Sequence, residues 1–190
     1  MGRIEGRPLR ADARRNRDKI LSTAVVMFAR DGLDATLDRI AKEAGVGPAT
    51  LYRNFSTREA LIEAAYRSEL RKLCEASAEL LDTLPPAQAL RAWMGRFIDY
   101  ANAKIGMADA LRALIDSGVN PYDHTREMMI TSVTSLLEAG GVDGSVRRDV
   151  SASDVVASLT GIAIASGKPP QLDLAERLLD LLMDGLVASR

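Results

Sequence analysis

The sequence of 190 residues contains one cysteine, one histidine and one tryptophan. A single cysteine, Cys74, cannot form a disulfide within the chain, which is typical of proteins in a reducing compartment. One histidine and one cysteine also leave few ligands for a transition metal, so we expect no metal and no other cofactor. The same scarcity leaves few groups for acid–base or nucleophilic chemistry, and we find no phosphate-binding glycine loop. The sequence therefore argues against an enzyme.

Long apolar segments are missing as well. The longest one, residues 155–165, is interrupted by Ser158, Thr160 and Gly161, and it is much shorter than the roughly 20 residues that cross a bilayer. The N-terminus is charged from Arg3 onward and lacks the apolar segment of a signal peptide. We therefore expect a cytoplasmic protein with no membrane partner.

Charge is unevenly distributed along the chain, although the net charge is only −1. Residues 1–72 contain 15 Lys and Arg against 10 Asp and Glu, whereas residues 73–190 contain 10 against 16. Basic residues are concentrated at the start of the chain, which we interpret as a basic flexible arm over residues 1–14. Such an arm leading into a folded unit is typical of phosphate binding, and a solvated tail without function is an equally good interpretation of the first ten residues.

The periodicity is helical throughout. Apolar residues make up 47% of the chain, enough for a core, and no stretch alternates apolar and polar residues for long. The pattern predicts an all-α fold of about nine helices, with Thr36 and Ser151 as N-caps and a capping box of Ser56 and Glu59. We expect helices near residues 20–31, 36–44, 48–55, 58–84, 86–104, 107–117, 122–139, 152–166 and 172–188, with Gly140 and Gly141 in a loop that continues to residue 151.

Residues 36–55 have the spacing of a helix-turn-helix, with two short helices joined by a glycine-containing turn. Leu51 and Phe55 of the second helix are predicted to pack inward. The remaining side chains of that helix suit DNA, since hydroxyls bind phosphates and arginine binds guanine or phosphate. The outward-facing set is Pro48, Ala49, Thr50, Tyr52, Arg53 and Asn54. Taken singly, Tyr52 is better explained as a core aromatic and Arg53 as an ordinary surface charge.

A longer series of residues extends this motif at fixed spacing. It consists of Arg17, Ile20, Leu21, Ala24, Phe28, Gly32, Thr36, Ile40, Ala41, Ala44, Gly45, Val46, Thr50, Leu51, Tyr52, Arg53, Asn54, Phe55, Glu59, Ala60 and Leu61. Over residues 15–66 the chain thereby resembles the TetR family of bacterial transcriptional regulators. It departs from the family pattern at Asn54, where histidine is usual, although asparagine keeps a hydrogen-bonding side chain.

The resemblance implies a helix-turn-helix DNA-binding domain over residues 15–60 and a helical regulatory and dimerisation domain over residues 61–190. It places Ala49, Thr50, Tyr52 and Arg53 at recognition-helix positions, and Thr36 and Arg58 at phosphate-contacting positions. Double-stranded operator DNA, a second copy of the chain and an unidentified small-molecule effector are the partners that it implies.

Aromatic and methionine residues in the second half are candidates for an effector pocket. Trp93, Phe97 and Tyr100 share one helical face, and flexible methionines suit a small-molecule site. Each residue taken singly fits an ordinary core better. The candidate pocket set is Trp93, Met94, Phe97, Tyr100, Met107, Leu111 and Met128.

The last two helices are apolar over more than one face, which indicates burial on two sides. We predict that they form a four-helix interface with a second copy; a helix pair buried within a monomer is the alternative. The predicted interface residues are Val155, Leu159, Ile162, Leu178, Leu182 and Leu186.

These observations favour a repressor that binds a near-palindromic operator as a dimer and is released by a small apolar or aromatic effector. In this hypothesis, the long helix from residue 58 to residue 81 couples the pocket to the DNA-binding domain. The competing hypothesis is an all-helical small-molecule carrier or enzyme that does not bind DNA.

Overall fold

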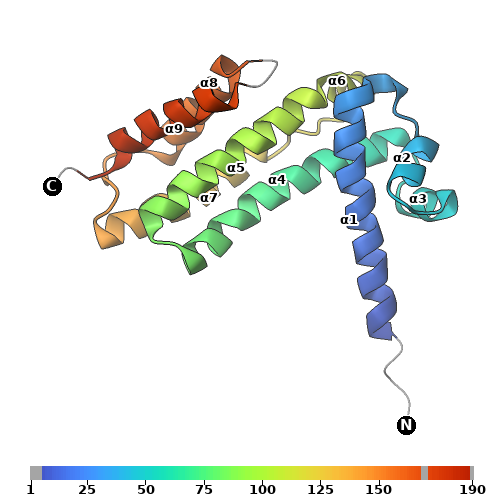
Figure 1. Ribbon diagram of the computed structural model, residues 1–190, viewed down its shortest axis with the longest axis horizontal. Coiled ribbons are helices and arrows are strands. Elements are labelled where there is room, and N and C mark those ends of the chain that lie inside the picture. Colours follow the sequence, from blue (N-terminus) through green and yellow to red (C-terminus); the bar gives the residue numbers. More distant parts are fainter. Residues whose placement is uncertain (1–5, 168–170, 189–190) are drawn as a thin grey trace, which may run out of the picture. The chain divides into compact units, whose positions relative to one another are not determined.

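The computed structural model describes residues 6–167 and 171–188, which fold into helices and connecting loops (Figure 1). The predicted all-α fold is confirmed. The helices within the described residues are α1 Gly6–Asp31, the 3-10 helix η1 Gly32–Asp34, α2 Leu37–Glu43, α3 Pro48–Asn54, α4 Arg58–Thr83, α5 Pro86–Gly106, α6 Ala108–Asp116, α7 Thr125–Asp143, α8 Ala152–Ala165 and α9 Leu172–Leu186.

The chain divides into two compact units. The head unit consists of described residues 6–68 and 103–121, and the body unit consists of described residues 69–102 and those from 122 onward. The segment that contains α6 thus belongs to the head unit, although it follows residue 60 by some 40 positions in the sequence. Residues 6–14, predicted as part of a flexible arm, lie within α1. The proposed domain boundaries at residues 14 and 60 remain predictions.

The core of the head unit forms where the periodicity predicts it. Ile20, Ala24 and Phe28 of α1 are fully buried, as are Ile40 of α2 and Leu51 of α3. The hydroxyl of Thr36 accepts a hydrogen bond from the Arg39 amide at 3.3 Å, which confirms Thr36 as the N-cap of α2. Pro48 is the first residue of α3, where its missing amide proton costs nothing. These signals set the start points of both short helices.

The helix α4 begins at the predicted residue, but its N-cap differs from the prediction by one position. The Thr57 hydroxyl accepts a hydrogen bond from the Ala60 amide at 3.1 Å, and α4 begins at Arg58. The predicted capping box of Ser56 and Glu59 is therefore wrong, because the N-cap has moved from Ser56 to Thr57. Ser56 is exposed.

The core of the body unit centres on α5. Trp93 is fully buried, and its indole N–H donates to the carbonyl of Leu73 in α4 at 2.9 Å. The ring centroids of Trp93 and Phe97 are 6.0 Å apart, and those of Phe97 and Tyr100 are 6.1 Å apart. This aromatic series confirms the shared helical face, and Figure 1 shows α4 and α5 running alongside each other.

The helix α7 continues through Gly140 and Gly141 and ends at Asp143, followed by Gly144 in a left-handed conformation with φ of 78°. The prediction of a loop at Gly140 was wrong, because this glycine serves packing. A Cβ on Gly140 would lie 2.4 Å from Cγ2 of Val146. The bare backbone thus lets the next segment fold back, and the Val146 amide donates to the Gly140 carbonyl at 3.0 Å.

Helices α8 and α9 lie side by side in the body unit (Figure 1). Ser151 accepts a hydrogen bond from the Asp154 amide at 3.2 Å, which confirms the predicted cap of α8. Arg91 of α5 forms ion pairs with Glu176 and Asp180 of α9 and so connects the two helices. Among the described helices, none combines the length and apolarity required to cross a membrane.

Candidate nucleic-acid interface

The helix α3 presents one buried and one exposed face. Leu51 is fully buried, whereas Pro48, Ala49, Tyr52 and Arg53 are exposed, with 46% of Tyr52 accessible. Thr50 is half-buried. The inward position of Leu51 and the outward position of Pro48, Ala49, Tyr52 and Arg53 are therefore as predicted. This arrangement leaves small, hydroxyl-bearing and cationic side chains open to a partner.

The polar side chains of α3 hold one another in place. Arg53 donates from Nη2 to the Thr50 hydroxyl at 3.1 Å, which orients the guanidinium along the exposed face. Asn54, which we expected to face outward, is half-buried and donates from Nδ2 to the Thr50 carbonyl at 2.8 Å. This bond lies within α3 and joins two residues four positions apart in the sequence.

Tyr52 is linked to α2 through its hydroxyl, which donates to a carboxylate oxygen of Asp38 at 3.3 Å. The negative charge of Asp38, together with partial burial, raises the pKa of Tyr52 above its ordinary value. The phenol is therefore protonated at neutral pH, and its one O–H donor is directed to Asp38 in the free protein. Sequence reasoning missed Asp38, because nothing in the spacing alone pairs it with Tyr52.

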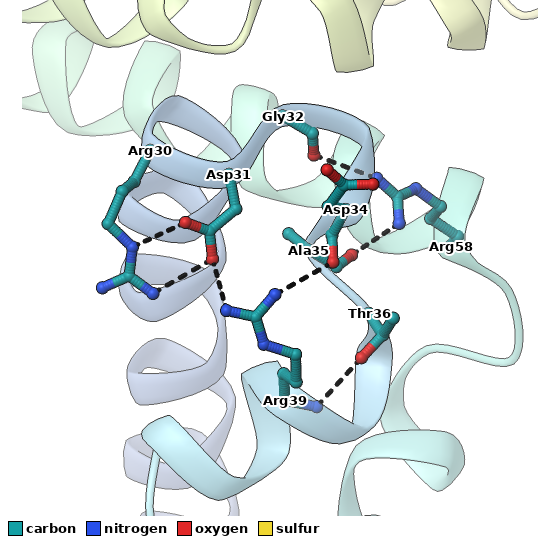
Figure 2. Close-up of polar contacts among 8 residues, drawn as sticks. All are labelled: Arg30, Asp31, Gly32, Asp34, Ala35, Thr36, Arg39 and Arg58. Atoms are coloured by element: carbon teal, nitrogen blue, oxygen red, sulfur yellow. Dashed lines mark hydrogen bonds and ion pairs between the residues drawn. The ribbon is translucent and has the colours of Figure 1, made fainter.

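The corner between α1 and α2 is fixed by charged contacts that Figure 2 shows. The Asp31 carboxylate accepts hydrogen bonds from Arg30 at 2.7 and 3.1 Å and from Arg39 at 2.8 Å. Arg39 also donates to the carbonyl of Asp34 at 3.2 Å. The hydrogen bond from Arg30 and the charges of both arginines hold the pKa of Asp31 below its ordinary value. The exposed Thr36 lies directly at this corner.

Arg58, a predicted phosphate contact, is half-buried at the start of α4. Its Nη1 donates to the carbonyl of Ala35, and its Nη2 donates to the carbonyl of Gly32 at 3.1 Å (Figure 2). The guanidinium also lies over the ring of Phe28, 5.2 Å from the ring centroid. The structure thus directs Arg58 toward the backbone of the head unit.

A second cation–π contact joins the first helix to the end of α3. The guanidinium of Arg17 lies over the ring of Phe55, 4.6 Å from its centroid. Phe55 is buried and Arg17 is exposed. The basic residue therefore covers the C-terminal end of α3 while its charge stays in solvent.

The seven candidate pocket residues are divided between the two units. Trp93, Met94, Phe97 and Tyr100 are buried in the body unit, and Met128 of α7 is 38% exposed. Met107 and Leu111 are buried in the head unit, at the start of α6. The indole N–H of Trp93 is bonded to a backbone carbonyl, so this residue carries a structural role in the core.

A groove of about 530 Å³ lies in the body unit at the end of α7 and the start of α8. It forms because the segment after Gly144 folds back over the helix. Arg147 there pairs with Asp149 at 2.6 and 2.7 Å, and this contact lowers the pKa of Asp149 to about 2. The lining residues are Thr134, Leu137, Glu138, Gly141, Val142, Arg147, Arg148, Val150 and Ala152, none of which we predicted.

The six candidate interface residues fall into two groups. Val155, Leu159 and Leu186 are at most 3% exposed within the single chain, so they have almost no surface left for a second copy. Ile162, Leu178 and Leu182 are half-buried. The large apolar side chains that remain exposed on α8 and α9 are Ile164, Leu172 and Leu181. Helical periodicity identified two apolar faces but did not show which one packs within the chain.

Comparison with known proteins covers both units. Residues 20–65 match the family model for bacterial regulatory proteins of the tetR family, and residues 85–188 match that for the C-terminal domain of SbtR-like transcriptional regulators. A solved TetR transcriptional regulator from Streptomyces coelicolor is 56% identical, with a TM-score of 0.87 over 92% of this chain and 99% of that one. A TetR transcription regulatory protein from Mycobacterium vanbaalenii is 32% identical, with a TM-score of 0.78. The match covers 95% of this chain and 100% of that one.

A curated relative gives the same result. The HTH-type transcriptional repressor KstR2 of Mycolicibacterium smegmatis is 31% identical over 141 residues, which cover 70% of this chain and 69% of the relative. The helix-turn-helix head and the helical body together define a transcriptional regulator of the DNA-binding class. The chain belongs to the TetR family. Its relatives are regulators, not enzymes, which excludes the enzyme alternative.

Proposed function

We propose that this regulator is a repressor that binds a near-palindromic operator as a homodimer and reads it with α3. The exposed face of α3 carries the proposal. Pro48, Ala49, Tyr52 and Arg53 are accessible while Leu51 anchors the opposite face in the core. A recognition helix requires this division, since one face must enter the major groove while the other remains packed.

The chemistry of this face supports base and phosphate contacts. Arg53 offers a planar fork that fits guanine O6 and N7, and Ala49 suits the methyl group of thymine. The hydroxyls of Thr50 and Tyr52 suit phosphate oxygens. Thr36 at the N-terminus of α2 adds a hydroxyl where the helix end favours an anion. These five positions, with Pro48, form the proposed DNA surface.

The exposed faces of α8 and α9 support the homodimer. Ala157, Gly161 and Ala165 are exposed at four-residue spacing on α8, and such small side chains permit close approach of another helix. On α9, Leu181 is 67% exposed between the half-buried Leu178 and Leu182. Two such helices from each chain form a four-helix interface with twofold symmetry. Val155, Leu159 and Leu186 instead hold α8 and α9 to their own chain.

An effector that releases the operator completes the proposal. The apolar body residues Trp93, Met94, Phe97, Tyr100 and Met128 remain the proposed pocket, whereas Met107 and Leu111 are buried in the head unit and are not assigned to it. Half-sites one turn of B-DNA apart are about 34–36 Å from centre to centre. An effector that favours another head spacing weakens binding, and tenfold weaker binding requires only about 1.4 kcal/mol of differential affinity.

The test begins with selection of duplexes from a random pool by the purified protein. We expect a near-palindromic consensus, and Tyr52→Ala and Arg53→Ala should abolish binding to it in gel shifts while circular dichroism stays unchanged. Arg126→Ala, which removes an exposed arginine from α7, is the matched control and should bind normally. Normal binding by both α3 variants would refute the assignment of the recognition helix. A protein that binds no duplex even at low salt would instead favour a carrier.

A further inference from the structure

The carbonyl groups of the corner between α1 and α2 are bonded by two arginines that come from different helices. Arg39 of α2 donates to the carbonyl of Asp34, whereas Arg58 of α4 donates to those of Gly32 and Ala35 (Figure 2). The helix η1 has three residues and so cannot satisfy these acceptors by itself. The conformation of this corner therefore depends on the two guanidinium groups.

The environment of Arg58 is that of a structural cation. Its side chain is half-buried, two of its nitrogens donate to backbone carbonyls, and its guanidinium lies over the ring of Phe28. An arginine that binds phosphate must direct its donors toward solvent. Arg53, in contrast, is exposed and donates one hydrogen bond to Thr50. Most of its N–H donors therefore remain accessible.

The carbonyl of Ala35 connects Arg58 to the recognition surface. Ala35 is fully buried and immediately precedes Thr36, the N-cap of α2. The peptide that joins Ala35 to Thr36 is planar, so a bond that fixes its carbonyl also fixes the first residue of α2. The helix α2 leads into the turn before α3, where the amide of Val46 donates to the carbonyl of Ala41 at 3.0 Å. Arg58 thus acts at the beginning of the recognition unit.

We propose that Arg58 is a positioning residue for DNA recognition, which fixes the corner between α1 and α2 so that Thr36 and α3 meet the duplex together, and that it does not itself bind phosphate. This inference rests on the proposed reading of DNA by α3. Lysine cannot replace arginine in this role, because its single ammonium group lacks the planar fork that reaches two carbonyls while stacking on an aromatic ring.

The experiment compares wild type, Arg58→Lys and Arg58→Gln on the duplex that the wild-type protein selects. Lys42→Gln, which removes an exposed cation from α2, controls for loss of charge alone. Affinity is measured between about 50 and 200 mM salt. We expect Arg58→Lys to bind about tenfold more weakly or worse, as for loss of a hydrogen bond to a charged group, with the same dependence of log affinity on log salt.

A phosphate contact gives the opposite pattern. Arg58→Lys would then keep the wild-type affinity for DNA. Arg58→Gln would reduce the magnitude of the slope of log affinity against log salt by about 0.9. Either result overturns the inference. A purely structural role is also distinguishable, because Arg58→Lys would then melt earlier while binding DNA with unchanged affinity in the cold, and this result overturns the inference too.

Hydrogen exchange of the free protein supplies a measurement that does not need DNA. Arg58→Lys should accelerate exchange of the amides of residues 36–41 but not of those in α8. Unchanged exchange at residues 36–41 overturns the inference. If the wild-type protein selects no duplex, the proposed function fails, and the exchange experiment still decides whether Arg58 fixes this corner.

Discussion

Different interactions stabilise the interior of each of the two units of this regulator. In the head unit, α2 and α3 contain seven residues each and bury only Ile40, Ala41 and Leu51. Arginines that bind backbone carbonyls and carboxylates fix the corner beside them. In the body unit, longer helices enclose an apolar core around Trp93. A helix that exposes one face to DNA cannot bury that face, so polar contacts replace part of the missing apolar packing.

Charge is divided along the chain in a similar but not identical way. Residues 1–72 carry an excess of basic residues and residues 73–190 an excess of acidic ones. A duplex attracts the first and repels the second. The near-neutral total therefore conceals a polarity that favours approach of DNA to the head unit.

Removal of the largest buried side chain should give the largest loss of stability and should test the apolar core of the body unit. Trp93→Ala removes a fully buried indole together with its bond to Leu73, and we expect a loss of about 3–5 kcal/mol. Urea unfolding followed by circular dichroism measures it. A loss below about 1 kcal/mol would show that the body unit does not depend on this core.

Two glycines of α5, one closely packed and one not, allow a test of close packing in the head unit. A Cβ on Gly106 would lie 2.7 Å from that of Ala29 in α1, and neither backbone can yield easily. We expect Gly106→Ala to destabilise the protein by about 1–3 kcal/mol, as for overpacking. The matched control is Gly95→Ala in the same helix, where the nearest atom is 4.0 Å away.

Gly95→Ala should instead leave stability unchanged or raise it by up to about 1 kcal/mol, because alanine favours the helix. Thermal unfolding of the two variants under identical conditions gives the comparison. Equal effects of the two substitutions would contradict the close contact between α5 and α1 within the head unit.

The ion pairs of Arg91 test how much charge contributes to the body unit. The side chain of Arg91 is 26% exposed, and those of its partners Glu176 and Asp180 on α9 are 60% and 65% exposed. Such exposed pairs contribute about 0–1 kcal/mol, so Arg91→Met should cost no more than that and should reduce the dependence of stability on salt. A loss several times larger, measured by urea unfolding, would show that charge and not the apolar core joins α5 to α9.

Acid should lower the stability of both units, because each contains a carboxylate that is bonded to an arginine. We expect these losses of stability to be smaller than those of the substitutions above. Hydrogen bonding by an arginine lowers the pKa of Asp31 in the head unit and brings that of Asp149 in the body unit to about 2. Because both values lie below the unfolded value of about 3.9, the stabilisation is complete above that pH. It is lost as the pH falls through the folded pKa.

Asp31→Asn and Asp149→Asn should each reduce the fall in melting temperature between about pH 5 and about pH 2. Melting curves of the variants and of wild type over this range measure the difference. A fall in melting temperature as steep as that of wild type in both variants would mean that other carboxylates cause the acid sensitivity.

Much of the fold was predictable because local signals set the helix ends. Thr36, Pro48 and Ser151 each begin or cap a helix where their chemistry predicts it. Gly140 misled the prediction, since glycine ends helices but also permits close contact, and only the position of Val146 distinguishes the two.

The candidate site was predictable in its outline and not in its contacts. The inward and outward faces of α3 follow from periodicity alone. The direction of Arg58 does not, because its partners Gly32 and Ala35 are more than 20 residues away in the sequence. For the same reason, the apolar stripes of α8 and α9 did not show that Leu159 packs within the chain while Leu181 stays exposed.

Hydrogen exchange with and without the selected duplex decides whether the head unit reads DNA through α3. We predict slower exchange on binding in peptides that cover residues 36–54, with no slowing in α8 and α9. Slowing in α8 and α9 together with unchanged exchange at residues 47–54 would contradict the account.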